Sequence, residues 1–547
     1  MHRKPSGRRN FLKSATAGIA ASTFVGLPLA TGTATGAATG AAPAHPSRPA
    51  SAAASNIEVT SFGAKGDGKS LDSPAINKAI EAAATAGGGN VVFPAGSYLC
   101  FSIHLKSNIA LVLSPGATIL AADPPSDPNA PAYDLAESNA PWEHFQDFGH
   151  NHWHNSLIWG EGLENVGIVG PGLIHGKGLS RGYGDGPKAE TPGVANKSIA
   201  LKNCRNVLLR DFSILHGGHF GILATGVDNF HIDSLKIDTN RDGIDVDCCR
   251  NVRISNCSVN SPWDDAICPK SSFALGYARS TEFLTIDNCY VTGNYEEGTL
   301  LDGTFKAFPP EAKVWRNGRI KFGTESNGGF RNITVSNCVF DNCQGLALES
   351  VDGALLEDVT IANITMRGVR SAPIFMRLGA RMRGPAGVPV GTLRRITISN
   401  LVCSGAEPKI ASIISGIADH PIEDLKLENI IIEHQGGGTV EDAKRELAEK
   451  ENAYPEPTMF GATPAHGFFL RHVQGIEMNG VKIISKSPDA RPAFYLDDVR
   501  AADFFQIKAP AAPGAPVFSL HNVREFSVAR SKPVPNTDLA SVESKNL

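Results

Sequence analysis

The sequence predicts an all-β fold, namely a single-stranded right-handed parallel β-helix with a capping helix at its N-terminal end. Short segments that alternate apolar and polar residues recur through the chain, and three of them open at Asn206, Asn229 and Asn251. Such alternation is typical of a strand with one buried face. The steps of 23 and 22 residues suit one coil of a solenoid, in which copies must stack to bury their apolar faces. A β-propeller would need blades of about 40 residues, and these repeats are shorter.

A recurring Asn before an apolar residue supports the same architecture. It precedes cysteine in Asn256-Cys257, Asn288-Cys289 and Asn337-Cys338. We expect the Asn side chains to stack as a hydrogen-bonded ladder and the cysteines to form a column of interior thiols. The ten cysteines lie between Cys100 and Cys403 without the spacing of a zinc site.

The first segment of the fold is predicted to be the cap. Residues 73–84 suit a helix with Ser73 as N-cap, Pro74 at the first helical position and apolar residues on one face. Gly87-Gly88-Gly89 would end it, and the first strand would start at Asn90.

The N-terminus resembles an export signal rather than part of the fold. Ser6-Gly-Arg-Arg-Asn-Phe-Leu-Lys13 matches a twin-arginine motif and precedes a mildly apolar run; a basic tail before a membrane anchor is the alternative. We predict a signal peptide at 1–30, a low-complexity linker at 31–55 and a catalytic β-helix domain at 56–547. The expected location is periplasmic or extracellular, with the twin-arginine export machinery as a partner. No later stretch is apolar and long enough for stable membrane insertion.

The charge composition restricts the classes of molecule that the protein is expected to bind. The formal net charge of the 547 residues is −4, so no overall basic field points to nucleic acid. We expect a monomer that acts on a polysaccharide or oligosaccharide and needs no cofactor.

Candidate catalytic residues lie in Asn240-Arg-Asp-Gly-Ile-Asp245 and in the pair Asp264-Asp265. Asp264 follows Asp242 by 22 residues, one coil, so their side chains should stack on neighbouring coils. Clustered carboxyl groups repel each other as anions, so one keeps its proton, as acid/base cleavage of a glycosidic bond requires. The alternative is that these aspartates merely serve turns.

A family resemblance adds to this prediction. Residues 57–68, the stretch from Gly87 to Gly96, residues 170–178 and the three aspartates resemble the polygalacturonases of glycoside hydrolase family 28. The resemblance implies a metal-independent, inverting hydrolase of α-linked pectic chains, of galacturonan or rhamnogalacturonan type. By motif, it implies that Asp264 is the general acid and that Asp242 and Asp265 hold and deprotonate water.

The chain departs from the family's pattern around these residues. Arg241 stands where the family has Thr, Ala266 where it has Cys, and the Gly-His-Gly motif is missing. The family's Arg-Ile-Lys, which grips the substrate carboxylate, falls on Leu346–Glu349, whereas Arg319-Ile320-Lys321 lies one coil too early. We therefore expect a rebuilt sugar-recognition shell.

Candidate substrate-binding residues follow from these departures. They are Arg319, Lys321, Glu325 and Arg377. Glu325 or Glu349 would suit the hydroxyl groups of a neutral sugar better than a carboxylate. Arg377, with Arg381 and Arg383, forms a cationic loop that is either a solvated turn or a site suited to an acidic glycan. No metal site is predicted, although His144, His150, His152 and His154 could bind a metal, stack on sugar with Trp142 and Trp153, or simply pack an inserted loop.

Other functions remain open from the sequence. A β-helical lyase would need Ca²⁺ and release unsaturated products, and a non-catalytic solenoid would tolerate Asp264→Asn. Insertions at 290–318 and 432–466 could close one end of a cleft and favour exo-action on the chain.

Overall fold

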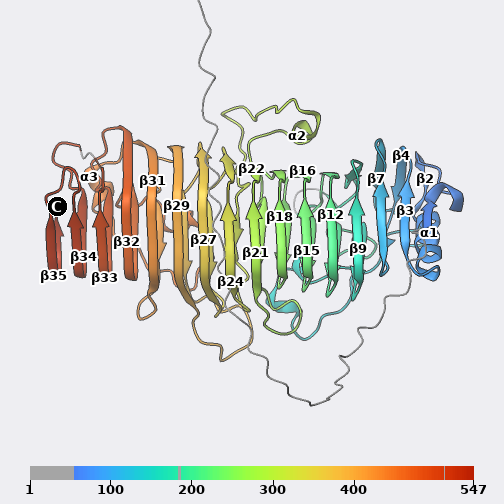
Figure 1. Ribbon diagram of the computed structural model, residues 1–547, viewed down its shortest axis with the longest axis horizontal. Coiled ribbons are helices and arrows are strands. Elements are labelled where there is room, and N and C mark those ends of the chain that lie inside the picture. The colour runs from blue at the N-terminus through green and yellow to red at the C-terminus, as the bar shows by residue number, and fades with distance from the viewer. Residues whose placement is uncertain (1–54, 183–185, 510–511) are drawn as a thin grey trace, which may run out of the picture. The chain divides into compact units, whose positions relative to one another are not determined.

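The computed structural model describes residues 55–182, 186–509 and 512–547. The predicted signal peptide and nearly all of the predicted linker lie outside the described residues. Within residues 55–547 the strands lie side by side in a long stack that runs from α1 to the C-terminus (Figure 1). No helix among the described residues is long and apolar enough to cross a membrane.

The strands form three columns, and each coil contributes one strand to each column in the N-terminal part of the stack. The first column contains β5 (Ile103–His104), β8 (Ile158–Glu161), β11 (Lys197–Lys202), β14 (Phe220–Thr225), β17 (Asp242–Asp247), β20 (Ile267–Lys270), β23 (Lys321–Phe322), β26 (Leu346–Ser350), β28 (Ile374–Leu378) and β30 (Ser412–Ser415). The second contains β1 (Ser55–Glu58), β3 (Gly89–Phe93), β6 (Ile109–Leu113), β9 (Glu164–Val169), β12 (Arg205–Arg210), β15 (Asp228–Asp233), β18 (Arg250–Ser255), β21 (Thr281–Asp287) and β24 (Phe330–Ser336). The third contains β2 (Asp67–Leu71), β4 (Gly96–Cys100), β7 (Ala117–Ala121), β10 (Leu173–His175), β13 (Ser213–Leu215), β16 (Lys236–Asp238), β19 (Ser258–Asn260), β22 (Tyr290–Thr292) and β25 (Val339–Asp341).

Toward the C-terminus the columns merge into long strands. The second and third columns join in β27 (Leu355–Arg367), β29 (Thr392–Ala406) and β31 (Ile422–Gly436), all three join in β32 (Phe468–Ser487), and the first and second join in β33 (Phe494–Phe505) and β34 (Phe518–Ala529). All neighbours along the columns pair in parallel until the last strand, β35 (Thr537–Asn546), which runs antiparallel to β34. The parallel β-helix is therefore confirmed, and β35 closes its C-terminal edge.

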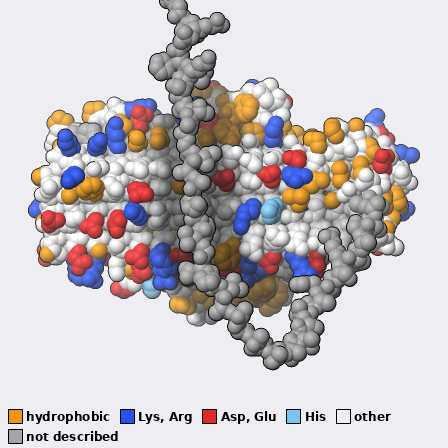
Figure 2. Space-filling model, viewed as in Figure 1, with side chains coloured by type: hydrophobic (Ala, Val, Ile, Leu, Met, Phe, Trp, Pro, Cys, Tyr) orange, Lys and Arg blue, Asp and Glu red, His pale blue; other side chains and the backbone are white. Residues whose placement is uncertain are grey.

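Inward-facing residues of the three columns build one continuous core. Ile222, Ile244 and Ile267 stack on consecutive coils of the first column, each fully buried. The ten cysteines are free thiols and all are buried, as the sequence predicted. Charged side chains of both signs are interspersed on the face shown in Figure 2, consistent with the small net charge.

The Asn ladders are also confirmed. Asn288 donates to the side-chain oxygen of Asn256 at 2.7 Å, and Asn363 to that of Asn337 at 3.0 Å. These residues have φ between 53° and 58°, a left-handed conformation that Asn tolerates better than most residues. The Asn pattern therefore reflects both the turn conformation and the ladder.

The N-terminal cap exists but begins one residue earlier than predicted. Helix α1 (Ser73–Thr85) has Asp72, not Ser73, as N-cap, with Pro74 in its first turn. The Asp72 carboxylate instead accepts hydrogen bonds from the backbone N–H groups of Lys65 and Gly66. The first strand is also earlier than Asn90, because β1 and β2 precede the helix.

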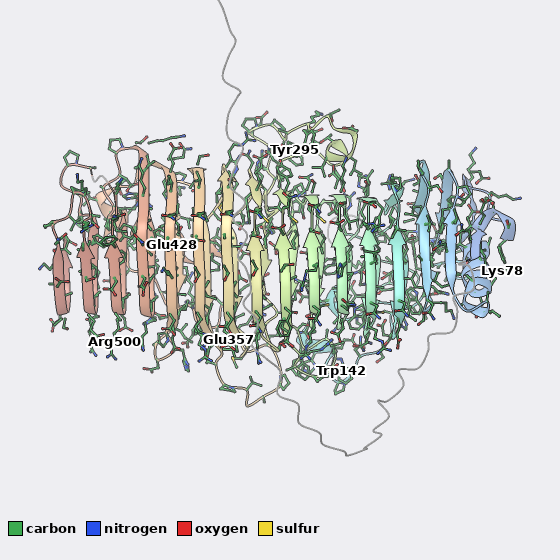
Figure 3. All side chains as sticks on the ribbon, in the orientation of Figure 1. Lys78, Trp142, Tyr295, Glu357, Glu428 and Arg500 are labelled. Atoms are coloured by element: carbon green, nitrogen blue, oxygen red, sulfur yellow. The ribbon has the colours of Figure 1, made fainter. Side chains whose placement is uncertain are left out.

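Shorter helices occur in the connections between coils. They are α2 (Thr299–Asp302), α3 (Val440–Ala443) and the 3₁₀ turns η1 (Val59–Phe62), η2 (Glu143–Phe145), η3 (Phe148–His150) and η4 (Pro457–Phe460). Figure 3 places Tyr295, in the connection that carries α2, and Trp142, beside η2, at opposite edges of the stack.

Candidate active site

Asp242, Asp264 and Asp265 converge, as the sequence predicted. Asp242 is the first residue of β17, and the other two precede β20 on the next coil. One carboxylate oxygen from each lies within 4.8 Å of the others. Ile244 pairs with Ile267, a step of 23 rather than 22 residues, because the turn before β20 holds one more residue. Asp242 is therefore level with Asp265 rather than with Asp264.

The glycine between the aspartates allows the close stacking of the coils. The Gly243 N–H donates to the backbone oxygen of Asp265 at 3.0 Å. A Cβ on Gly243 would lie 2.5 Å from the backbone oxygen of Ala266, closer than two such atoms can approach. The Asp-Gly sequence thus brings Asp242 against the next coil.

Asp265 is an ionised carboxylate held by two cations. Arg319 Nε lies 2.9 Å from one carboxylate oxygen, and Lys321 Nζ lies 2.6 Å from the other. Burial by itself would raise the pKa of Asp265, but Lys321 and Arg319 outweigh burial and lower the pKa to about 2. Asp265 therefore stays deprotonated over the range in which most enzymes work.

The pKa of Asp242 is shifted in the opposite direction from that of Asp265. It is 2% exposed, and burial followed by the nearby Asp245 and Asp264 raises its pKa well above the usual range. Its Oδ1 has no hydrogen-bond partner. Asp242 therefore holds a proton more tightly than the neighbouring Asp265 does.

Asp264 is the member of the group that reaches solvent. Its side chain is 21% exposed. Arg241 donates to Asp264 Oδ2 from Nε at 3.1 Å and from Nη2 at 2.7 Å. The arginine that replaces the family's threonine thus pairs directly with one of the three aspartates.

Comparison with known proteins agrees with this geometry. Residues 143–274, which contain all three aspartates, match the model described as glycosyl hydrolases family 28. Residues 221–377 match a right-handed beta helix region, and residues 56–129 match rhamnogalacturonase A/epimerase, pectate lyase-like. The region that carries the three aspartates is thus similar to glycoside hydrolase family 28, in a match that covers less than half of the chain. The chain is a glycoside hydrolase with a right-handed β-helix fold.

Its relatives are distant. The chain is 24% identical over 407 residues to a probable polygalacturonase of Vitis vinifera, covering 69% of this chain and 74% of the relative. It is 24% identical over 411 residues to an exo-poly-alpha-D-galacturonosidase of Dickeya chrysanthemi, covering 65% of this chain and 63% of the relative.

Two solved structures share the fold. An exopolygalacturonase from Thermotoga maritima has a TM-score of 0.58 at 20% identity, covering 79% of this chain and 92% of that one. A family 28 exopolygalacturonase from Yersinia enterocolitica has a TM-score of 0.61 at 19% identity, covering 82% and 79%.

The predicted substrate-binding residues of this glycoside hydrolase are buried and paired. Arg319 has no exposed side-chain surface, and besides Asp265 it bonds Gln344 at 3.0 Å and Glu456. Glu325 contacts His150 at 3.1 Å and Arg383 at 2.7 Å, and its pKa is well below the usual range because His150, Lys270 and Arg383 together outweigh burial. Arg319, Lys321 and Glu325 lie around the aspartates, where a substrate role stays a prediction.

Arg377 lies apart from this group. It is 1% exposed, and its guanidinium donates to Ser415 Oγ and to the backbone oxygens of Gly416 and Glu449, each at 2.8 Å. These bonds tie β28 to the insertion after β31. The geometry gives Arg377 a structural contact, and its predicted role in substrate binding remains untested.

Two insertions cover the outward face of the first column on either side of the aspartates. Trp153, from the connection between β7 and β8, packs on the outward-facing Ala200 and Leu223 of β11 and β14. Phe460, from the connection between β31 and β32, packs on the outward-facing Ala347, Phe375 and Ile413 of β26, β28 and β30. The aspartates at β17 and β20 thus lie between two covered regions.

His219, Tyr454 and Glu456 were not predicted as site residues, because they lie in connections between strands. Tyr454 and Glu456 reach Lys321 and Arg319 from a loop more than a hundred residues away in sequence. His150, one of the histidines considered from the sequence, and His219 each place a ring nitrogen within 4.8 Å of an Asp242 oxygen. Asp245 could be found from the sequence, since it shares the motif with Asp242.

The other histidines of the first insertion do not converge with His150 on one point. His152 Nδ1 lies 2.8 Å from the backbone oxygen of Phe148, and His154 Nε2 lies 2.9 Å from Glu161. These contacts of His152 and His154 agree with the interpretation that the histidines belong to an inserted loop packed on the coil stack.

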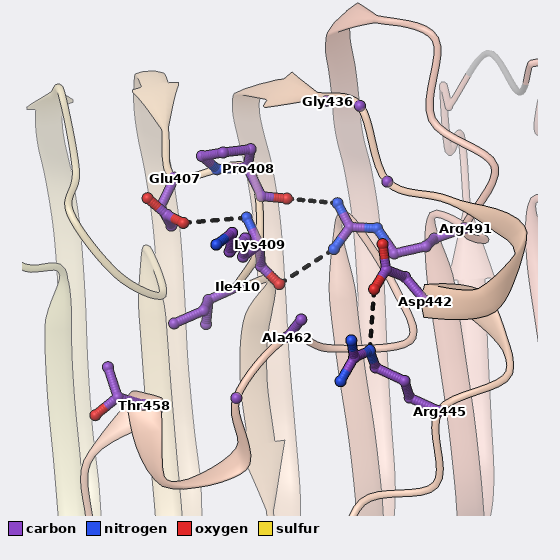
Figure 4. A pocket seen from close by; sticks show the side chains of 13 residues that line it. Glu407, Pro408, Lys409, Ile410, Gly436, Asp442, Arg445, Thr458, Ala462 and Arg491 are labelled. Atoms are coloured by element: carbon purple, nitrogen blue, oxygen red, sulfur yellow. Dashed lines mark hydrogen bonds and ion pairs between the residues drawn. The ribbon is translucent and has the colours of Figure 1, made fainter.

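A separate cavity of about 630 Å³ lies near the C-terminal end of the stack (Figure 4). Arg491 projects into it but is fixed by Asp489 and by the backbone oxygens of Pro408 and Lys409. None of the three aspartates lines this cavity, so it is distinct from the candidate active site.

Proposed function

We propose that this glycoside hydrolase cleaves α-linked pectic polysaccharide, of galacturonan or rhamnogalacturonan type, by inverting acid/base hydrolysis. The observation that carries the proposal is the convergence of three aspartates, two of which have pKa values shifted in opposite directions. Asp242, whose pKa is raised, and Asp265, whose pKa is lowered, lie within 4.8 Å and suit the roles of proton donor and base.

In the proposed reaction Asp265 is the base. It accepts a proton from a water molecule as the water oxygen bonds to the anomeric carbon. The glycosidic C–O bond breaks, and the leaving oxygen takes a proton from the Asp242–Asp264 pair. Asp264 is the exposed member and is the acid that the family motif implies, whereas Asp242 holds the proton before substrate binds.

The inverting outcome rests on the family resemblance rather than on the carboxylate separation. Inverting pairs are usually ~6.5–9.5 Å apart, wider than the closest approach of these oxygens. Proton NMR of the first product formed tests it, since inversion of an α-linkage gives the β-anomer first.

We further propose that cleavage occurs at chain ends. Insertions carrying Trp153 and Phe460 cover the first column on both sides of the aspartates, which leaves no long uncovered run of that face for an extended chain. The exo-acting names of the Dickeya relative and of the two solved structures support this mode.

Products resolved by size test this function. We expect pectic oligosaccharides to be shortened one unit at a time. A spread of internal fragments would contradict chain-end attack, and unsaturated products that absorb ultraviolet light would contradict hydrolysis.

Export is proposed from the sequence alone. The Arg8-Arg9 motif supports it, and polymeric pectin outside the cell is the substrate that an exported enzyme would meet. Replacing both arginines with lysine should then retain the protein inside the cell, as fractionation would show.

A further inference from the structure

Six cations around the three aspartates already have carboxylate partners. Among the described residues, Arg241 pairs with Asp264 and Lys321 with Asp265, whereas Arg319 pairs with both Asp265 and Glu456. The remaining pairs are Lys270 with Asp245 and Glu325 at 3.5 Å each, Arg381 with Asp352, and Arg383 with Asp147 and Glu325. A substrate carboxylate would find each of these positive charges already compensated.

Glu456 is the partner that does not belong to the coil stack. It comes from the insertion between β31 and β32, 137 residues after Arg319, and its side chain is 25% exposed. Tyr454 of the same segment lies with its ring 6.0 Å from Lys321 Nζ. Segment 454–456 therefore covers both cations of Arg319-Ile320-Lys321.

Several buried carboxyl oxygens near these cations lack a hydrogen-bond donor. Both carboxyl oxygens of Asp245 and both of Glu349 lack a hydrogen-bond partner, although each side chain is fully buried. Asp245 lies on the coil of Asp242, and Glu349 lies on β26, on the other side of β20 along the first column. Asp245 has only the longer contact with Lys270 at 3.5 Å. Buried oxygens that lack a hydrogen-bond donor suit the hydroxyl groups of a sugar, which can donate to them.

These observations favour a neutral sugar over a uronate. Burying a carboxylate without a free cation is costly, whereas sugar hydroxyls would satisfy Asp245 and Glu349. On the basis of the proposed function, we infer that the sugar residue bound beside the aspartates is neutral, which favours the rhamnogalacturonan type over galacturonan. Glu456 is a specificity-determining residue for this choice, because it takes the position on Arg319 that a substrate carboxylate would occupy.

A matched pair of substrates tests the inference. Oligogalacturonides are compared with the same oligosaccharides after reduction of their carboxyl groups to primary alcohols, so that linkage and length stay constant. We expect kcat/KM of the wild type to be at least about tenfold higher on the reduced substrate, the effect of one unfavourable charge contact. A preference for the galacturonides would overturn the inference and leave hydrolysis intact.

Variants of the insertion test the role of Glu456. Glu456→Gln frees Arg319 and should raise kcat/KM on galacturonides about tenfold while changing that on the reduced substrate less than about threefold. Glu451→Gln, an exposed position in the same insertion, should change neither value. A parallel loss on both substrates for Glu456→Gln would indicate a purely structural role and overturn the assignment.

Binding separates this inference from the proposed function. Calorimetric titration with galactose and with galacturonate requires no turnover. Tighter binding of galactose by wild type, lost in Glu456→Gln, supports the inference even if neither oligosaccharide is cleaved. Tighter binding of galacturonate by wild type would overturn it. Absence of cleavage of both substrates and of rhamnogalacturonan would count against the proposed function.

Discussion

The three aspartates differ because of the side chains that surround each one. Asp265 is held by Lys321 and Arg319, Asp242 is buried beside other carboxyl groups, and Asp264 pairs with Arg241 at the surface. The same residue type thus carries different charges at one pH. This difference gives the site its acid/base capacity and makes it sensitive to single substitutions.

Lys321 sets the acidic limit of activity in this account. Lys321→Met removes a cation 2.6 Å from Asp265, so the pKa of Asp265 should rise from about 2. We expect the acidic limb of the kcat/KM profile to move upward by about one pH unit or more, in line with the loss of a close charge pair. Measurements of kcat/KM between pH 2.5 and 6 give the position of this limb, with Lys78→Met at an exposed position as the control. Identical acidic limbs in Lys321→Met and the wild type would contradict the role of Asp265 as base.

Glu349 makes stability depend on pH. Burial raises its pKa to about 8, so the folded protein keeps a proton that the unfolded chain loses near pH 4. Its stabilising contribution is complete below about pH 4 and declines as pH rises toward 8. Glu349→Gln should therefore reduce the loss of Tm between pH 5 and pH 8, with Glu543→Gln on the surface as control. An equally steep loss in Glu349→Gln would show that Glu349 is ionised when folded.

At the scale of elements, the turns of the β-helix depend on Asn in a left-handed conformation. Asn288 has φ of 53° and donates to Asn256, and Asn363 repeats this arrangement on Asn337. Such turns let each coil repeat the register of the previous one, which places Asp242 and Asp265 side by side.

Two substitutions at Asn288 separate the ladder bond from the turn conformation. Asn288→Gly removes the side-chain bond but tolerates positive φ, and we expect a loss of about 1 kcal/mol in the free energy of unfolding. Asn288→Ala adds the strain of a left-handed residue, about 1–2 kcal/mol more. Denaturant titration measures both, and equal values for the two variants would contradict a contribution from turn conformation.

The insertions make contacts that the repeated coils do not provide. Trp153 and Phe460 pack on outward-facing residues of the first column, and Glu456 reaches Arg319. The repeats therefore position the catalytic carboxyl groups, whereas the insertions determine which part of the substrate can approach them.

At the scale of the whole molecule, the two ends of the coil stack are closed differently. Helix α1 lies at the N-terminal end (Figure 1), and the antiparallel β35 pairs with β34 at the other. An open edge of parallel strands would present unpaired N–H and C=O groups to other chains.

Removal of β35 tests its capping role. A chain ending at residue 535 should keep the site, since the aspartates lie many coils away, but should self-associate through β34. Light scattering against protein concentration measures this association. A monodisperse truncated protein with unchanged Tm would contradict the role of β35 as an edge cap.

Much of the fold and the catalytic group could be predicted because the repeat carries the information. The spacing between Asp242 and the Asp264–Asp265 pair is one coil to within one residue, so their proximity follows from the period of the strands. The pairing of Arg319 and Lys321 with Asp265 could not be predicted, because the repeat period shows on which coil a residue lies but not where its side chain points. Glu456 and His150 could not be placed, since nothing in a loop sequence fixes where the loop returns.

The most direct test of the account is the rate of glycan release by Asp242→Asn and Asp264→Asn, measured on a substrate that the wild type cleaves. Each variant should keep the Tm of the wild type within a few degrees and lose at least about 10²–10³-fold in kcat, as expected when a positioned acid is removed. Wild-type rates in both variants would show that the aspartates serve the turns of the β-helix and do not perform the hydrolysis.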